Sequence, residues 1–465
     1  MMKNIKNILI AGLVCCGISA TTTSCRENEF GEVDLDIPED TYTPIEASYS
    51  FASHCAMYTD ADFQRVKQSL DNGSAPQVVK DELQNLKNSK YTLLSYTPTP
   101  QTKIVRGDPK GTGFDSENYA YAMRDAAAAY QMGMLWRLTG DDRYATKAVE
   151  ILNAWANTCT EIASNDANQV LAAGAQGYTF ANAAGMLHDF SGWATSQREQ
   201  FKQWILKVFA AKNKNFLDTH TGSNVCAEHY WSNWDLVNMC SYFAIGVLTE
   251  NSEMVNYVVN YFYQGVGNGC IKRLIRGIHS DPLGTGETIC QNQESGRDQG
   301  HSEMSMMVTA NLAQMAWTLY QANPSVKELD FFSANDNAIM KMGEYVALFN
   351  LRNGNDNKNA TGSWLVSATQ MPFERFEYCQ PGCGCSNQSH GAIHTQAADD
   401  SGRGSIRPGW EILLAHYKNT TGHKYIQQMA DKIRPEGGAG EGLNRYGDNS
   451  GAFDQLGWST IMLYQ

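Results

Sequence analysis

A run of charged and amide side chains at positions 291–304, QNQESGRDQGHSEM, carries the residue types best suited to chemistry in this chain. A helix that begins near Ser295 would place its ionisable groups three, four and seven residues apart, and therefore on one face. These groups are Glu294, Arg297, Asp298 and His301, with Gln293 beside them. A histidine, an arginine and carboxylates at a loop-to-helix junction suit proton transfer and recognition of an anion. The alternative is a solvated helix start whose Arg and Asp pair at the surface.

A second run, NVCAEHYWSNWDLVN at 224–238, combines aromatic rings with hydrogen-bonding groups. Its candidate substrate-contacting residues are His229, Tyr230, Asn233 and Trp234. In a helix, His229 and Asn233 lie one turn apart. Aromatic faces stack on sugar rings, while His, Tyr and Asn supply donors and acceptors. The alternative is a core helix whose polar groups are satisfied internally.

A third candidate is Arg407, in the run RGSIRPGWE at 403–411. Arginine at a helix start suits bidentate recognition of a carboxylate. A surface pair with Glu411 is the alternative, and it would contribute little. Tyr378 is our candidate for a phenol in the site, chosen from twenty-two tyrosines.

Together these residue types suit β-elimination on a uronic acid. Abstraction of the C5 proton requires the neighbouring carboxylate to be neutralised by Arg, Asn or a protonated His. A His or Tyr must take that proton, and a Tyr or His must protonate the departing O4. Hydrolysis would instead use two placed carboxylic acids, for which Glu294, Asp298 and Glu228 are available. The sequence contains neither His-Glu-x-x-His spacing nor a phosphate-binding glycine loop, so we expect no metal or other cofactor.

The elements that must position these residues are mostly helices, because strand-like alternation is scarce before the last hundred residues. Helical periodicity covers 117–138, 142–158, 171–190, 197–212, 225–248, 252–264, 301–321, 337–350, 408–417 and 424–433. Helices joined by short turns predict stacked antiparallel hairpins. Since the hairpins are too irregular for a consensus solenoid, we expect an all-α fold closed into an (α/α) toroid, an incomplete or complete α/α barrel. The Gly- and Cys-rich stretch 352–404 predicts a long loop over one mouth.

The amino-terminal residues predict export. Lys3 and Lys6 precede an apolar run at 8–14, and small residues then lead to Cys25, the expected site of lipidation. Simple cleavage near Ala20 is the alternative. The predicted division is a signal peptide at 1–24, an acidic tether at 25–48 and one large toroid domain at 49–465. We therefore expect a periplasmic, outer-membrane or cell-surface lipoprotein that meets the membrane only through its anchor.

The formal net charge of −13 argues against a nucleic-acid partner, because binding phosphates requires a basic face. An acidic polysaccharide stays a candidate partner where the site is locally basic. Lys272, Arg273 and Arg276 offer such a basic strip, with a solvated helix face as the alternative.

The cysteines beyond Cys25 cannot all be paired with one another. Of the twelve, three lie at or before Cys25 and nine beyond it, and an odd number leaves at least one thiol unpaired. Cys379, Cys383 and Cys385 stand close together, and in an exported protein this favours a loop disulfide over a zinc site.

At these motifs the chain resembles bacterial alginate-lyase-domain proteins, most nearly those of polysaccharide lyase family 38. Residues 54–65, HCAMYTDADFQR, are similar to that group's opening His-Pro-Gly…Asp-Leu-x-Arg, with Cys55 in place of the proline. The resemblance continues through 125–130, 138–140, 154–155, 229–234 and 293–301, and so covers nearly all of the chain beyond residue 49. The last of these motifs is the most specific.

The resemblance implies an (α/α) toroid that cleaves alginate or a related 1,4-linked polyuronate without a metal, by β-elimination, to give unsaturated oligosaccharides. By position it implies that His229, Arg297 and His301 lie in the catalytic centre and that Asn233 helps to neutralise the carboxylate. The better-known alginate lyases carry Asn-Asn-His where this chain has Ala227, Glu228 and His229. Two alternatives stay open from the residues: a glycoside hydrolase acting on uronate oligosaccharides, and a non-catalytic surface lipoprotein that binds glycans.

Overall fold

The computed structural model of the chain describes residues 42–107, 116–220, 227–354, 362–377, 393–399, 402–405, 407–434 and 453–464. Helices make up most of this part, and its strands form three two-stranded sheets. The predicted signal peptide, Cys25 and most of the predicted tether lie outside the described residues, as do Tyr378 and the three neighbouring cysteines. Within the described part, no helix combines the length and the apolar character needed to cross a bilayer.

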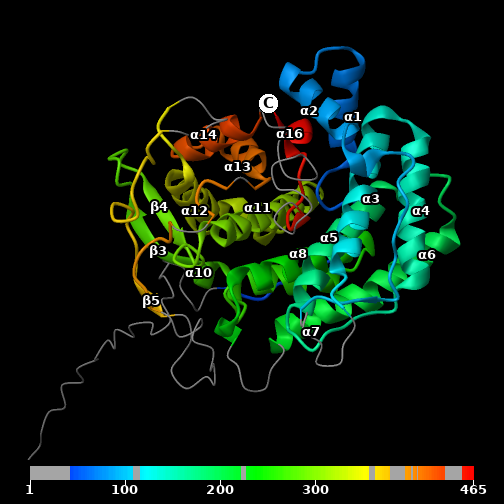
Figure 1. Ribbon diagram of the computed structural model, residues 1–465, viewed down its shortest axis with the longest axis horizontal. Helices are drawn as coiled ribbons and strands as arrows, with labels where there is room; N and C mark the ends of the chain where they lie inside the picture. Colours follow the sequence, from blue (N-terminus) through cyan, green and yellow to red (C-terminus); the bar gives the residue numbers. More distant parts are fainter. Residues whose placement is uncertain are drawn as a thin grey trace, which may run out of the picture.

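Helices of the described part follow one another around a ring, each in contact with the next (Figure 1). The inner helices are α3 (Tyr119–Thr139), α5 (Gln169–Met186), α8 (Ser232–Leu248), α11 (Gln299–Ala322), α13 (Trp410–Tyr417) and α16 (Ser459–Leu463). The helix α16 contacts α1 (Asp60–Asp71) and α2 (Gln77–Lys87), which in turn contact α3. The succession therefore closes on itself, and the predicted all-α (α/α) toroid is confirmed.

A second set of helices packs against this ring and completes the hairpins. They are α4 (Asp142–Thr158), α6 (Thr195–Ile205), α7 (Ala211–Thr219), α9 (Ser252–Gln264), α12 (Ala334–Asn350) and α14 (Lys424–Ile433). The difference between the two sets is one of burial. Every residue of α5 except the first is buried, whereas α4 buries one stripe that includes Ala148, Leu152 and Trp155. A helix covered on all sides belongs inside, and an amphipathic one belongs at the surface.

Two glycines of α5 face α8. A Cβ atom at Gly174 would lie 2.5 Å from Val237 Cγ2, and one at Gly177 would lie 2.0 Å from Ser241 Oγ. Both distances are too short for any side chain, so the absence of Cβ lets the two backbones approach. The start of α8, which carries part of the candidate site, is fixed by this packing.

Most predicted helices are confirmed, and the departures have local causes. The helix predicted at 197–212 is interrupted by a π turn (Leu206–Ala210) between α6 and α7. The helix predicted from residue 225 begins only at Ser232, after a 3-10 turn at Ala227–His229. The helix predicted from about Ser295 begins at Gln299, because the Asp298 side chain caps it by accepting from His301 N.

Strands that the sequence analysis did not predict flank the candidate site. The hairpin of β3 (Ile275–Ser280) and β4 (Thr288–Asn292) is antiparallel and leads directly into the polar run. A short antiparallel pair, β5 (Phe376–Glu377) and β6 (Ile393–His394), lies within the stretch predicted to be a long loop. In the described parts of 352–404 there is no helix. That this stretch covers one mouth stays a prediction.

Residues 42–48, predicted to belong to a solvated tether, are instead bound to α9. Asn260 Oδ1 accepts from the Tyr42 hydroxyl at 2.7 Å and from Ile45 N at 2.8 Å. Asn256 Nδ2 donates to Ala47 O at 2.8 Å. Side-chain amides thus supply this segment with the hydrogen bonds that a neighbouring strand would otherwise provide.

Candidate active site

The two most informative runs of the sequence meet at the carboxylate of Glu294, which is wholly buried. Its Oε1 accepts from Asn233 Nδ2 at 2.6 Å, from Asn233 N at 3.0 Å and from Ser305 Oγ at 2.6 Å. Its Oε2 accepts from Arg297 Nη1 at 3.1 Å. An anion at the first turn of α8 is stabilised by the unpaired N–H groups there. Glu294 therefore fastens the turn before α11 to the start of α8.

Gln293 strengthens the same junction. Its Oε1 accepts from Ser232 N at 3.0 Å, and its own backbone N donates to Leu274 O at 2.8 Å. Both Gln293 and Glu294 were predicted to contact the substrate, but their side chains have no exposed surface. They support the site instead of lining it, and that prediction is corrected.

Arg297 is held by several contacts. Besides Glu294, it reaches His301, since Nη2 lies 3.2 Å from His301 Nε2. The guanidinium carbon lies 4.8 Å from the centre of the Trp231 ring, which adds a cation–π contact. About 27% of the side chain is nevertheless exposed, so a ligand can reach it.

His301 is oriented by the carboxylate of Asp298. The ring Nδ1 lies 2.7 Å from Asp298 Oδ2, while the backbone N of His301 donates to Asp298 Oδ1 at 2.9 Å. Burial raises the pKa of Asp298, but the hydrogen bonds from His301 and the charge of Arg297 outweigh it and hold that pKa below its usual value. An ionised Asp298 keeps the proton on Nδ1 and leaves Nε2 directed at Arg297. The side chain of His301 is 38% exposed.

His229 lies just before α8, so the prediction that it shares a helical turn with Asn233 is wrong. The residues on either side of His229 are held by the Asn268 side chain, whose Nδ2 donates to Glu228 O at 3.0 Å and to Tyr230 O at 2.8 Å. Burial lowers the pKa of His229, so the imidazole is neutral at neutral pH. A neutral, half-buried imidazole has the protonation state that a general base needs.

The aromatic residues beside His229 form a packed wall. The Tyr230 ring lies 4.9 Å from the ring of His229 and 4.9 Å from that of Trp234. Tyr230 is only 7% exposed, and Asn233 is 2% exposed with its amide nitrogen bound to Glu294. Tyr230 and Asn233, both predicted to contact substrate, therefore belong to a supporting layer, whereas Trp234 is only partly buried.

Arg407 approaches the same region from the start of α13. Its Nη1 donates to Gln455 Oε1 at 3.0 Å and lies 3.6 Å from Asp454 Oδ2. Burial raises the pKa of Asp454. The charges of Arg106, Arg407 and His301 act in the opposite direction but do not outweigh burial. Arg407 thus pairs with this buried carboxylate, and the charge of His301 acts on it as well. The alternative pairing of Arg407 with Glu411 is wrong, because Arg434 binds Glu411 through two 2.8 Å hydrogen bonds.

The basic strip considered at 272–276 does not form. Arg273 pairs with the carboxylate of Glu228. Arg276 is almost completely buried, donates to Asn268 Oδ1 at 2.7 Å and stacks on Phe376. Of the two site arginines, Arg297 keeps 27% of its side chain exposed, whereas Arg407 keeps 11%.

Sequence reasoning missed His394, on β6. Its Nδ1 donates to Gly296 O at 2.8 Å, and its ring lies 5.7 Å from that of Trp231. No local pattern distinguishes this histidine, since nearly a hundred residues separate it from the turn it contacts. Tyr378, the candidate phenol, lies outside the described residues.

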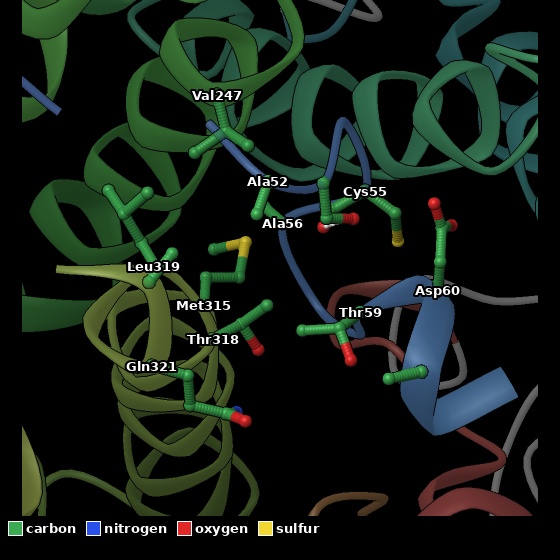
Figure 2. Close-up of a pocket in the computed structure, with 13 residues that line it drawn as sticks. Ala52, Cys55, Ala56, Thr59, Asp60, Val247, Met315, Thr318, Leu319 and Gln321 are labelled. Carbon is green, nitrogen blue, oxygen red and sulfur yellow. Dashed lines mark hydrogen bonds between the residues drawn. The ribbon is translucent and has the colours of Figure 1, made fainter. Parts of the chain in front are cut away.

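A pocket of about 330 Å³ lies elsewhere, between the segment at 52–61 and the carboxyl ends of α8 and α11 (Figure 2). Its lining is largely apolar, with Val247, Met315 and Leu319 on one side. Asp60 is the ionised residue on its wall, and it pairs with Arg137. This pocket lacks the convergent cations and histidines of the Arg297 region. In the described residues, no three His, Cys, Asp or Glu side chains gather as a metal site.

Comparison with known proteins identifies the family and agrees with the fold. The family model described as alginate lyase matches residues 74–356. No curated protein matches the chain. The crystal structure of an alginate lyase from Bacteroides ovatus is 13% identical, covers 83% of this chain and 99% of its own, and has a TM-score of 0.50. Alginate lyase A1-III from Sphingomonas species A1 is 18% identical over 65% of this chain and 81% of its own, with a TM-score of 0.43. The first of these structural likenesses supports the toroid fold.

Proposed function

The chain belongs to the alginate lyase family and is a polysaccharide lyase, and we propose that it cleaves alginate or a related 1,4-linked polyuronate at a site formed by His229, Arg297 and His301. The observation that carries the proposal is the 3.2 Å separation of Arg297 Nη2 and His301 Nε2 on a partly exposed wall. Glu294 ties this wall to the segment of His229.

Arg297 and His301 act on the carboxylate of the sugar. The guanidinium carries a permanent charge, and its Nη2 can turn from His301 to a carboxylate oxygen. When His301 is protonated, its Nε2–H donates to the same carboxylate, and Asp298 stabilises that cation. Two donors at the carboxylate stabilise the enolate-like charge that forms when the C5 proton leaves.

His229 takes the C5 proton. Its pKa is lowered by burial, so the ring enters the reaction neutral and able to accept a proton. A tyrosine protonates the departing O4, and Tyr378 is our assignment from the sequence. Arg407 binds a neighbouring uronate of the chain, which a polyanion supplies on either side of the cleaved bond.

The carboxylates available for hydrolysis are all engaged, which argues against the glycoside hydrolase alternative. Glu294 accepts five hydrogen bonds and is wholly buried. Glu228 pairs with Arg273, and Asp298 holds His301. Hydrolysis requires one protonated acid facing the glycosidic oxygen and a second carboxylate across the bond.

The test is to incubate the protein with alginate, polymannuronate, polyguluronate and glucuronan and to follow the ultraviolet absorbance of the unsaturated product. The expected result is a rise in absorbance with at least one polyuronate. Reducing ends without absorbance would indicate hydrolysis, and binding without either product would indicate a glycan-binding protein.

We also propose that the protein is exported and lipid-anchored through Cys25. The support is the charged, apolar and small-residue order of residues 3–25. Labelling cells with a fatty acid and comparing the wild type with Cys25→Ala tests it. The label should enter the wild type alone, and equal labelling of both proteins would refute the anchor.

A further inference from the structure

His394 lies against the turn that presents Arg297. Its Nδ1 donates to Gly296 O at 2.8 Å, and four residues later Ala398 N donates to Ser295 O at 3.0 Å. Two consecutive carbonyls immediately before Arg297 are thus bound by the segment at 394–398. A Cβ at Gly296 would lie 2.7 Å from His394 Cβ, so the segment and the turn are in direct contact.

The imidazole also supports the ring beneath Arg297. It stands at 65° to the Trp231 ring, 5.7 Å away, and its centre lies 5.1 Å from that of the Phe376 ring. The Trp231 ring in turn carries the Arg297 guanidinium at 4.8 Å. His394 therefore contacts both the main chain that leads to Arg297 and the aromatic face on which its charge rests.

The protonation state of His394 is defined by its partners. A carbonyl oxygen only accepts, so Nδ1 must carry the proton in the contact with Gly296. Nε2 is buried and has no hydrogen-bond partner among the residues that the structure describes. Burial lowers the pKa of His394, and the charge of Arg297 lowers it further against the effect of the Gly296 hydrogen bond. The ring is consequently neutral and does not compete with Arg297 for an anion.

We propose that His394 is a positioning residue for Arg297, holding its turn through Gly296 and its aromatic support through Trp231. This inference rests on the proposed function, in which Arg297 grips the uronate carboxylate. A displacement of about 1 Å in such a group can lower the rate about a hundredfold.

Two substitutions separate the hydrogen bond from the ring. His394→Asn places an amide N–H near the position of Nδ1, whereas His394→Phe keeps a ring and removes the donor. We expect kcat/KM on the best polyuronate to fall about ten- to a hundredfold in His394→Phe, and His394→Asn to recover most of that loss. Thermal melts of both variants establish that they are folded.

His416 supplies a matched control. It is another largely buried histidine, stacked on Phe332 at 3.9 Å and set edge-on to Trp317 at 4.7 Å. His416→Phe should lower stability without changing kcat/KM. If both His→Phe variants lose the same activity, or if His394→Phe loses none, the positioning role is refuted.

Coupling to Arg297 gives a second readout. The Arg297→Lys substitution already disturbs the contact between Arg297 and the uronate carboxylate. Adding His394→Phe to it should therefore lower kcat/KM little further, because both changes act on one interaction. If the two substitutions instead lower kcat/KM by independent factors that multiply, the inference is refuted. A crystal structure of His394→Phe tests the positioning without relying on activity. In it, the Arg297 guanidinium should no longer lie over the Trp231 ring. An unmoved Arg297 would refute the role of His394, whereas a wild type without lyase activity would refute the proposed function alone.

Discussion

Asp298→Asn isolates the one carboxylate that gives His301 its orientation. Asp298 does two things at once, because Oδ1 caps α11 through His301 N and Oδ2 binds His301 Nδ1. Asparagine is as good an N-cap as aspartate, so the helix should stay intact. With its oxygen on the backbone, however, the amide turns its NH₂ towards Nδ1. That forces the proton onto Nε2, where it faces the donor Nη2 of Arg297 at 3.2 Å.

The size of the effect follows from the bond that is lost. A hydrogen bond to a charged group contributes about 1.5–3 kcal/mol, which corresponds to roughly a ten- to hundredfold fall in kcat/KM. The assay is the initial rate of unsaturated product at several substrate concentrations, with a thermal melt of each variant. Asp141→Asn is the matched control, since Asp141 caps α4 through Arg143 N at 3.1 Å. The reasoning fails if Asp298→Asn keeps the wild-type rate, or if Asp141→Asn loses as much.

Three further predictions address the base, the packing and the pH dependence. His229→Ala should lower kcat about a hundredfold or more with little change in KM, measured by the same product assay, and an unchanged kcat would exclude it as the base. Gly177→Ala should destabilise the fold by about 1–3 kcal/mol in denaturant unfolding because its Cβ would lie 2.0 Å from Ser241 Oγ, and an unchanged unfolding midpoint would contradict this packing. Burial raises the pKa of Glu82 to about 8 in the folded protein. In the unfolded chain Glu82 ionises at a lower pH, so the free energy of unfolding should fall by about 1.4 kcal/mol per pH unit between the unfolded and folded pKa values. Glu82→Gln should remove this loss, and equal pH profiles for both proteins would contradict it.

The fold was predictable to the extent that its information is local. The bounds predicted at 142–158, 252–264 and 424–433 coincide with α4, α9 and α14, because amphipathic periodicity is strongest in helices with one buried face. The helices α1 and α2 were missed, although Thr59 and Asp62 form a capping box at the start of α1. The β3–β4 hairpin was missed because its burial is asymmetric along the strand and does not alternate.

The types of the candidate residues could be predicted from the sequence, but which of them are buried could not. Periodicity placed Glu294 and Arg297 on one helix face, yet both lie in a turn before α11, and their contact survives because a turn also brings residues three apart together. Which of the polar residues are buried depends on contacts across the ring, such as Asn233 with Glu294. His394 depends on a contact about a hundred positions away in the chain. Pairings of that range leave no local trace in one sequence.

The toroid offers a way to reduce the repulsion between a protein with a net charge of −13 and a polyanion. In a ring of antiparallel hairpins every second helix runs the same way, so the starts of the inner helices gather at one mouth. The starts of α8 and α11 meet at Glu294, and Arg407, just before α13, lies 3.6 Å from Asp454 Oδ2. Arg106 is a further neighbour of Asp454 and stacks on Tyr119, the first residue of α3. Each helix start adds about half a positive charge. The helix starts add their positive potential to the charges of Arg297, Arg407 and Arg106 and so offset the carboxylates of Glu294, Asp298 and Asp454 at this mouth.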